Sequence, residues 1–104
     1  MKKVIVLLIS VFVFAGFAFG DVFITELADP NNADGARFVE LYNNGSSDID
    51  LSTGWQLQRA TNGNTDWQTA KNLTGMISAG GFYIVCANQS TFTSTFEFAA
   101  DQDI

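Results

Sequence analysis

Residues 37–45 read Arg-Phe-Val-Glu-Leu-Tyr-Asn-Asn-Gly, and this stretch decides how the rest of the chain is interpreted. Val39 and Leu41 fall on one face of an extended strand, because successive side chains of a strand point to opposite sides. The Asn-Gly pair at its end tolerates a positive φ, which is typical of a turn. The stretch therefore predicts a strand that ends in a tight turn.

Short apolar or alternating runs of the same kind recur on both sides of this segment, separated by Gly, Asn, Asp, Ser and Thr. Beyond residue 20 no long 3.6-residue periodicity occurs, so the domain is predicted to be all-β. The apolar run 82–87 is the expected centre of the sheet, with the single cysteine, Cys86, as a buried side chain. Residues 89–104 fit either an irregular loop or a distorted edge strand. The other expected strands cover residues 22–28, 49–51 and 55–59, the last with Trp55 and Leu57 buried.

The first 20 residues have the composition of a secretory signal peptide. Two lysines precede an apolar run over residues 4–19, and small residues occupy the −3 and −1 positions ahead of Asp21. The run is shorter than the roughly 20 residues that span a bilayer, and no basic cluster follows it. We therefore expect the leader 1–20 to be removed during export. This leaves one domain over residues 21–104, without stable membrane insertion, in a secreted or cell-surface protein of bacterial type.

Without the leader, three basic residues stand against eleven acidic ones. Nucleic acid is excluded as a partner, since its affinity for proteins comes largely from Lys and Arg. The chain has no histidine, which excludes imidazole acid–base catalysis, and one cysteine cannot form an internal disulfide. The acidic excess favours cations or basic surfaces as partners. The basic residues are Arg37, Arg59 and Lys71.

Four segments carry a family resemblance: residues 24–27 (Ile-Thr-Glu-Leu), 37–45, 49–57 (Ile-Asp-Leu-Ser-Thr-Gly-Trp-Gln-Leu) and 77–85 (Ile-Ser-Ala-Gly-Gly-Phe-Tyr-Ile-Val). In order and spacing they resemble the lamin-tail domain. The resemblance covers about residues 22–87 and implies an immunoglobulin-like β-sandwich. In bacteria it also implies a secreted or cell-surface module, often attached to extracellular nucleases, phosphatases or other hydrolases, whose role is binding or attachment.

A sandwich of this type needs about seven strands and about 100 residues. Only about five strands are predicted within residues 21–104, whereas the family pattern continues with further strands. Such a domain would leave the edge of a strand unpaired. We therefore expect the sandwich to lack its last strands and the chain to be the N-terminal part of a larger protein.

The richest cluster of oxygen ligands lies between residues 29 and 40. Asp29, Asn31 and Glu40 have the spacing of positions 1, 3 and 12 in a calcium-binding EF-hand loop, but the residues between them do not keep its register. Two interpretations stay open. One is a weak calcium site; the other is an ordinary turn whose polar side chains bond their own backbone. The candidate calcium ligands are Asp29, Asn31, Asp34 and Glu40, and no other cofactor is implied.

Glu26 and Glu40 each lie within an apolar strand, where an ionised carboxylate needs a partner. Facing each other, they would form a glycosidase-like acid–base pair. Otherwise they accept backbone N–H groups, pair with Arg37 or Arg59, or point to solvent. Because so short a chain has little room for a substrate groove, we expect no catalysis by it.

Trp67 follows a turn-forming segment and is the candidate for an exposed ring that stacks on a ligand such as a sugar; packing is the alternative. The sequence as a whole predicts an exported, non-catalytic module that binds a protein or a cell-surface polymer. Two alternatives stay open. One is an accessory domain of an extracellular hydrolase whose catalytic part lies beyond this chain; the other is a calcium-dependent adhesin or carbohydrate-binding module.

Overall fold

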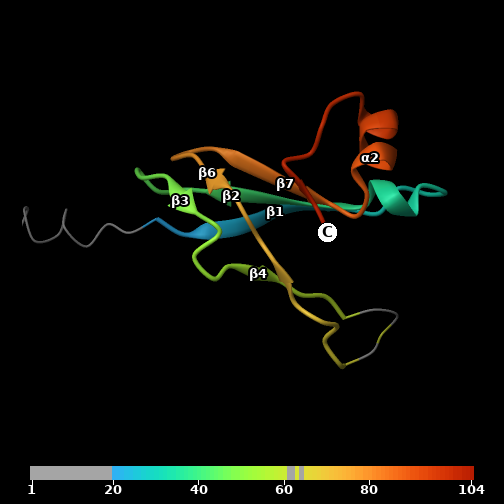
Figure 1. Ribbon diagram of the computed structural model, residues 1–104, viewed down its shortest axis with the longest axis horizontal. Helices are drawn as coiled ribbons and strands as arrows, with labels where there is room; N and C mark the ends of the chain where they lie inside the picture. The colour runs from blue at the N-terminus through green and yellow to red at the C-terminus, as the bar shows by residue number, and fades with distance from the viewer. Residues whose placement is uncertain (1–19, 61–62, 64) are drawn as a thin grey trace, which may run out of the picture.

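The computed structural model describes residues 20–60, 63 and 65–104, so the predicted leader lies outside the described residues except for Gly20. Strands dominate, with one short α-helix and one turn of 3-10 helix (Figure 1). The all-β prediction is therefore confirmed. In the described ranges no helix is both long and apolar enough to cross a membrane. The elements are β1 (Val22–Ala28), η1 (Asp34–Ala36), β2 (Phe38–Asn43), β3 (Ile49–Asp50), β4 (Gln56–Leu57), β5 (Lys71–Asn72), β6 (Met76–Ile77), β7 (Phe82–Cys86), α2 (Gln89–Phe96) and β8 (Gln102–Asp103).

The larger sheet has the strand order β1-β2-β7-β8 (Figure 1). Strand β2 pairs antiparallel with both β1 and β7, whereas β8 lies parallel to β7. The prediction that residues 82–87 lie inside the sheet is confirmed, because β7 has a neighbour on each side.

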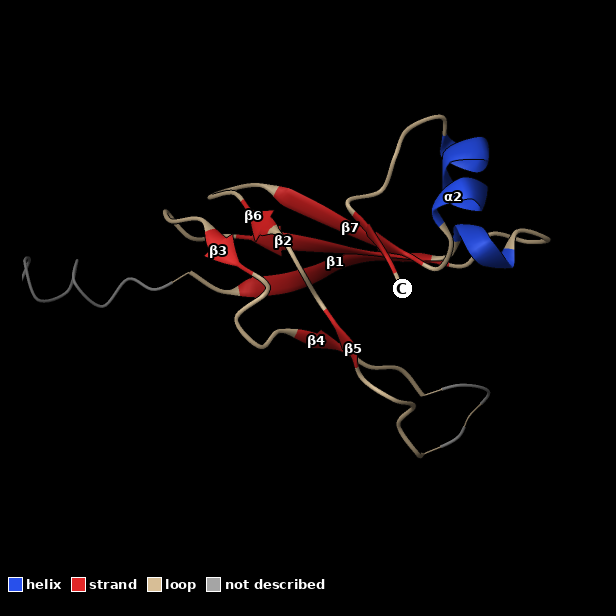
Figure 2. Cartoon of the chain, viewed as in Figure 1, coloured by secondary structure: helices blue, strands red, loops and turns tan. Residues whose placement is uncertain are grey.

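The second layer is one irregular hairpin, drawn as two short strand pairs in Figure 2. Strand β3 pairs with β6, and β4 pairs with β5. Between these pairs, the Leu51 N–H donates to Gly75 O at 2.8 Å and the Leu73 N–H donates to Trp55 O at 2.9 Å. The two pairs are therefore joined into a single ladder, whose far end carries the turn between β4 and β5.

The core lies between the sheet and this hairpin. Directly opposed residues of a sheet share one face, so the pairing places Val39, Leu41, Tyr83 and Val85 together on what we call the inner face. The faces predicted for residues 38–42 are confirmed. The buried residues of this core are Leu41, Tyr83 and Val85 from the sheet and Leu51, Leu73 and Ile77 from the hairpin.

Helix α2 covers one end of the opposite, outer face of the sheet. The prediction of an irregular loop or edge strand over residues 89–104 is wrong for residues 89–96, which form this helix, while β8 supplies a short edge strand. The Asn88 side chain caps the helix by accepting the Thr91 N–H at 3.0 Å. Phe92 is fully buried against Cys86 and Ala100. Cys86 is thus a buried side chain, as predicted.

Asn43 is the one buried polar residue of the described chain, and it joins three segments. Its side-chain amide donates to Ser47 O at 2.8 Å and to Ile77 O at 3.2 Å, and its Oδ1 accepts the Gly45 N–H at 2.9 Å. The end of β2, the following turn and β6 are therefore fixed to one another through a single side chain.

Candidate functional site

A groove of about 600 Å³ opens where the hairpin stands away from the sheet. Its floor is the inner face near the end of β1, where Ile24 is 56% exposed and Leu27 is 71% exposed. Its opposite wall comes from β4 and the turn that follows, with Leu57 and Trp67. The packed core therefore covers only part of the inner face, and the apolar side chains of β1 beside it stay exposed.

A β-bulge explains why Ile24 and Leu27 lie on the same face although they are three residues apart. Ile24 is opposite Leu41 and Leu27 is opposite Val39, with a register shift between Ile24 and Glu26. A bulge inserts one extra residue into a strand and so reverses the alternation beyond it. Both apolar side chains consequently face the groove.

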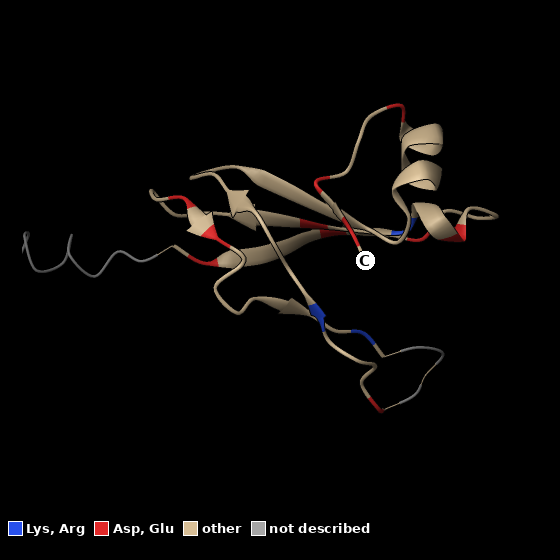
Figure 3. Cartoon of the chain, in the orientation of Figure 1, with Lys and Arg blue, Asp and Glu red and all other residues tan. Residues whose placement is uncertain are grey.

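The cations of the described chain gather at this groove. Arg37, Arg59 and Lys71 all line it, whereas Asp29 is the one acidic residue among its lining side chains. Figure 3 shows blue on the β4–β5 hairpin and at the end of the sheet beside α2, whereas red is spread over the chain. In a chain with an acidic excess, the groove is therefore a local basic region.

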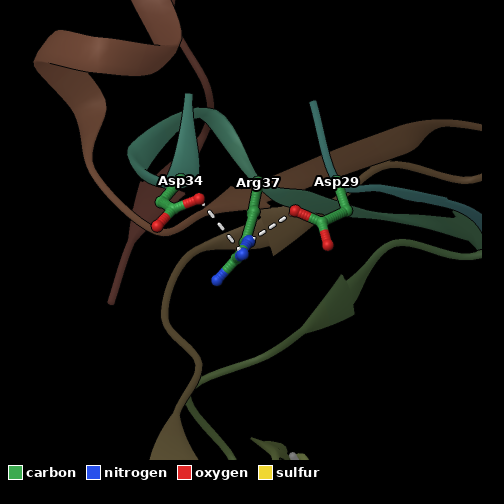
Figure 4. A network of polar contacts seen from close by, with 3 residues as sticks. All are labelled: Asp29, Asp34 and Arg37. Carbon is green, nitrogen blue, oxygen red and sulfur yellow. Dashed lines mark hydrogen bonds and ion pairs between the residues drawn. The ribbon is translucent and has the colours of Figure 1, made fainter. Parts of the chain in front are cut away.

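Among the described residues, Arg37 is the cation that forms ion pairs (Figure 4). Its Nε donates to Asp29 Oδ1 at 2.5 Å and its Nη2 donates to Asp34 Oδ1 at 3.1 Å. The hydrogen bond to Asp29, followed by the charges of Asp29 and Asp34, raises the pKa of Arg37 above its usual value. The guanidinium thus occupies the place between two of the predicted calcium ligands.

The other two predicted calcium ligands lie apart from this ion pair. Asn31 is exposed in the turn before η1. Glu40 lies on the outer face and accepts the Thr25 hydroxyl at 2.9 Å. Across the ranges that the structure describes, no three His, Cys, Asp or Glu side chains are grouped so as to hold a metal. A calcium site stays a prediction, and forming it would require Arg37 to release its carboxylates.

Glu26 and Glu40 do face each other across β1 and β2. Glu26 is exposed, and the partner of Glu40 is Thr25 rather than an arginine. Of the alternatives given for these carboxylates, exposure to solvent is the one found for Glu26. Arg37 binds Asp29 and Asp34, and the Arg59 Nε donates to Gln68 Oε1 at 3.1 Å.

Trp67 is 68% exposed at the rim of the groove, which agrees with its prediction as an exposed ring. Trp55 is 39% exposed, so its predicted burial is wrong; its backbone, through the bond to Leu73, belongs to the hairpin ladder. Sequence reasoning missed Ile24 and Leu27 as site residues. The signal available was their spacing of three in a strand of period two.

A second exposed apolar row crosses the uncovered part of the outer face. Phe23, Tyr42 and Phe82 oppose one another across β1, β2 and β7, and the rings of Tyr42 and Phe82 lie 4.9 Å apart. Phe23 is 46% exposed and Phe82 is 59% exposed. The rings of Tyr42 and Phe82 therefore form a cross-strand pair that is also part of the surface.

Comparison with known proteins agrees with this architecture. No curated protein and no solved structure matches the chain. A family model described as Lamin Tail Domain matches residues 16–103. This family has an immunoglobulin-like fold, which confirms the predicted β-sandwich of sheet and hairpin. With most of its length matched, the chain belongs to the lamin tail domain family.

Proposed function

We propose that this chain is an exported, non-catalytic module that attaches to a partner protein through the groove between β1 and the β4–β5 hairpin. The observation that carries the proposal is the open apolar strip of β1, where Ile24 and Leu27 remain exposed inside a concave site. Exposed apolar surface of this kind marks binding sites, because leaving it in water costs free energy. Membership of an immunoglobulin-like family supports a binding or structural role.

The chemistry of the groove supports binding rather than catalysis. The chain has no histidine, and Asp29, the one carboxylate among the lining side chains, is bound by Arg37. General acid–base catalysis needs a group that can exchange protons close to the substrate. Apolar and basic side chains are instead suited to holding a ligand.

Export is tested by the intact mass and the N-terminal sequence of the native protein in the medium and the cell envelope. We expect a chain that begins at Asp21, since the small residues before it fit a signal-peptide cleavage site. A native protein that retains residues 1–20 and stays in the cytosol would overturn this part of the proposal.

Attachment through the groove is tested by a photo-crosslinking residue placed at Leu27 in the native cells. Phe82 is the matched control, because it is also exposed and apolar but lies on the outer face. We expect a discrete adduct from position 27 and none from position 82. Equal adducts at both positions, or none at position 27, would exclude the groove as the attachment site.

A further inference from the structure

We infer that the partner at this site is a second copy of the chain, which adds its own β1 antiparallel to the free edge of β1. This inference rests on the proposed function and names the partner of the same site. It follows from three properties of β1: the exposure of its apolar side chains, the direction of its free backbone groups and the position of its bulge.

Strand β1 is an edge strand with apolar side chains exposed on both faces. In the described chain it pairs with β2 alone. All five residues from Phe23 to Leu27 are exposed, with Ile24 and Leu27 on the inner face and Phe23 on the outer face. An exposed apolar edge of this kind is a template for pairing with another strand.

The backbone of β1 at Ile24 and Leu27 is directed at the free edge. Residues along an antiparallel strand bond alternately to one neighbour and to the other. Arg37 O accepts the N–H of the residue after β7 at 2.9 Å, so Val39 and Leu41, two and four residues later, also bond toward β7. Leu27 and Ile24 are opposite these two residues and therefore do not bond to β2. Their N–H and C=O groups remain for a further strand.

The bulge lets β1 pair with its own copy around a two-fold axis between Thr25 and Glu26. Opposed residues of neighbouring strands share a face, and adjacent residues of a regular strand do not. An axis between two residues of a regular strand would therefore oppose inner to outer side chains. In β1 both bulge residues lie on the outer face, where the Thr25 hydroxyl donates to the Glu40 carboxylate and Glu26 is opposite Glu40. An axis through either bulge residue alone would again mismatch the faces.

The exposed apolar side chains meet in this register. Ile24 is opposite Leu27 of the second copy on the inner face, and Phe23 is opposite Ala28 of the second copy on the outer face. Each contact occurs twice, because a two-fold interface uses the same surface of both copies. The Ile24–Leu27 pairs also bring together the backbone groups that are directed at the free edge. Pairing would thus remove exposed apolar surface of β1 from water and complete its hydrogen bonds.

Acidic side chains beside the axis give the pairing an electrostatic signature. Glu26 is opposite Thr25 of the second copy, so no two carboxylates are directly opposed across the new edge. The two Glu26 side chains are nevertheless diagonal neighbours, and each lies opposite the Glu40 of its own copy. Like charges at this spacing repel each other. Removal of the Glu26 charge should therefore tighten the association.

The register is tested with cysteine variants of the protein as isolated from its native compartment. Ile24→Cys and Leu27→Cys are oxidised separately and as an equal mixture. Directly opposed residues are close enough for a disulfide, so the mixture should form disulfide dimers at least about tenfold faster than either variant alone. Phe82→Cys mixed with Leu27→Cys is the control, because Phe82 lies on the outer face of β7. The native Cys86 is 1% exposed and should form no dimer in the unmodified protein.

The association itself is measured by sedimentation equilibrium of the native protein over a range of concentrations. We expect the average mass to rise with concentration toward that of two chains. Leu27→Ser should weaken the association about tenfold or more, while Phe82→Ser leaves it unchanged. Glu26→Gln should tighten it about threefold or more. Its control is Glu97→Gln, which removes the same charge at an exposed position after α2 and should have no effect.

The outcomes separate this inference from the proposed function. A protein that stays monomeric up to about 1 mM, or equal crosslinking by the cysteine mixture and by its separate variants, would overturn the inference. If the photo-crosslinker at Leu27 still captures a different protein in that case, the groove is the attachment site and its partner is not a second copy. An adduct of two copies of this chain at position 27, together with fast crosslinking of the mixture, would support both.

Discussion

Asn43 is the residue on which the connection between the two layers depends most. Its side chain donates to backbone carbonyls of the turn and of β6 and accepts one backbone N–H of the turn. Nothing in the neighbouring sequence indicates that an Asn at the end of a strand points inward. Its burial is a property of the sandwich, not of the segment.

Replacing Asn43 with Ala should lower the free energy of unfolding by about 2 kcal/mol, since the buried Ile77 carbonyl and two partly buried backbone groups, Ser47 O and the Gly45 N–H, would lose their partner. Chemical denaturation measures the change. Asn31→Ala is the control: Asn31 is exposed in a loop, so its replacement should cost no more than about 0.5 kcal/mol. Equal costs at the two positions would contradict the role assigned to Asn43.

Tyr83 predicts a pH effect. Its hydroxyl donates to Thr74 O at 2.6 Å, and burial, followed by the charge of Asp101, raises the pKa of the phenol above its usual value. A raised folded-state pKa gives stability that is complete below the unfolded pKa of about 10 and is lost as the pH rises through the folded value.

Tyr83→Phe should therefore cost about 1 kcal/mol at neutral pH and reduce the loss of stability above pH ~10. Unfolding free energies measured across the alkaline range test this. Tyr42→Phe on the outer face is the control and should leave the alkaline loss in place. If the two variants show the same loss of stability with rising pH, burial of the Tyr83 hydroxyl is not the cause of the alkaline loss.

Among the elements, the antiparallel pair β1–β2 contains a repulsive contact between two acidic side chains. Glu26 and Glu40 are directly opposed, and like charges at such positions are destabilising. Glu26→Lys should therefore raise the free energy of unfolding by about 0.5 kcal/mol, with Glu26→Gln giving part of the gain. Because salt screens the interaction, the gain of the Lys variant should shrink in molar NaCl; a gain that salt leaves unchanged would point to another cause.

Helix α2 predicts the behaviour of the thiol beneath it. Cys86 is 1% exposed, and burial, followed by the charge of Asp103, raises its pKa. A buried neutral thiol reacts slowly. Labelling of the native protein with a disulfide reagent should be slow and should become fast in Phe92→Ala, which removes the side chain that anchors the helix. Ser94→Ala changes an exposed position of α2 and is the control. If its thiol is labelled as fast as that of Phe92→Ala, loss of the Phe92 anchor does not explain the faster labelling.

Much of the sheet could be predicted from its period of two, whereas the helix could not. The strand 22–28 follows from its short apolar run, and the faces of Val39 and Leu41 follow from alternation. Residues 89–96 read Gln-Ser-Thr-Phe-Thr-Ser-Thr-Phe, and Ser and Thr have modest helix propensity. Here the helix is stabilised by burial of Phe92 and packing of Phe96 on the sheet, which are tertiary contacts that a local pattern does not contain.

The candidate site was predicted only in part, for a similar reason. Trp67 was expected to be exposed because it follows a turn, and it is. The groove depends on the bulge in β1 and on the separation of the β4–β5 hairpin from the sheet. Both result from pairing between distant segments. Arg59 and Lys71 are ordinary surface cations until that pairing places them on one wall.

At the scale of the whole molecule, the two layers should differ in local stability. Strands β2 and β7 lie inside the sheet, while the β4–β5 pair consists of two residues in each strand and borders an open groove. Amide hydrogen exchange should be slowest in β2 and β7 and fastest in the β4–β5 hairpin. Addition of a groove ligand should slow exchange in the hairpin and in β1. Equal protection of the amides in both layers would contradict a hairpin that is separated from the sheet by an open groove.

The order of the large sheet also determines how the domain would bear tension. Strands β1 and β8 form its two edges and run in the same direction, because β1 and β7 are both antiparallel to β2 and β8 is parallel to β7. The start of β1 and the end of β8 therefore point toward opposite ends of the sheet. A force applied through these two points acts along the strands and loads the backbone hydrogen bonds in shear, so many must break together. The β7–β8 ladder has only two residue pairs, so its hydrogen bonds should break first and β8 should detach before the other strands separate.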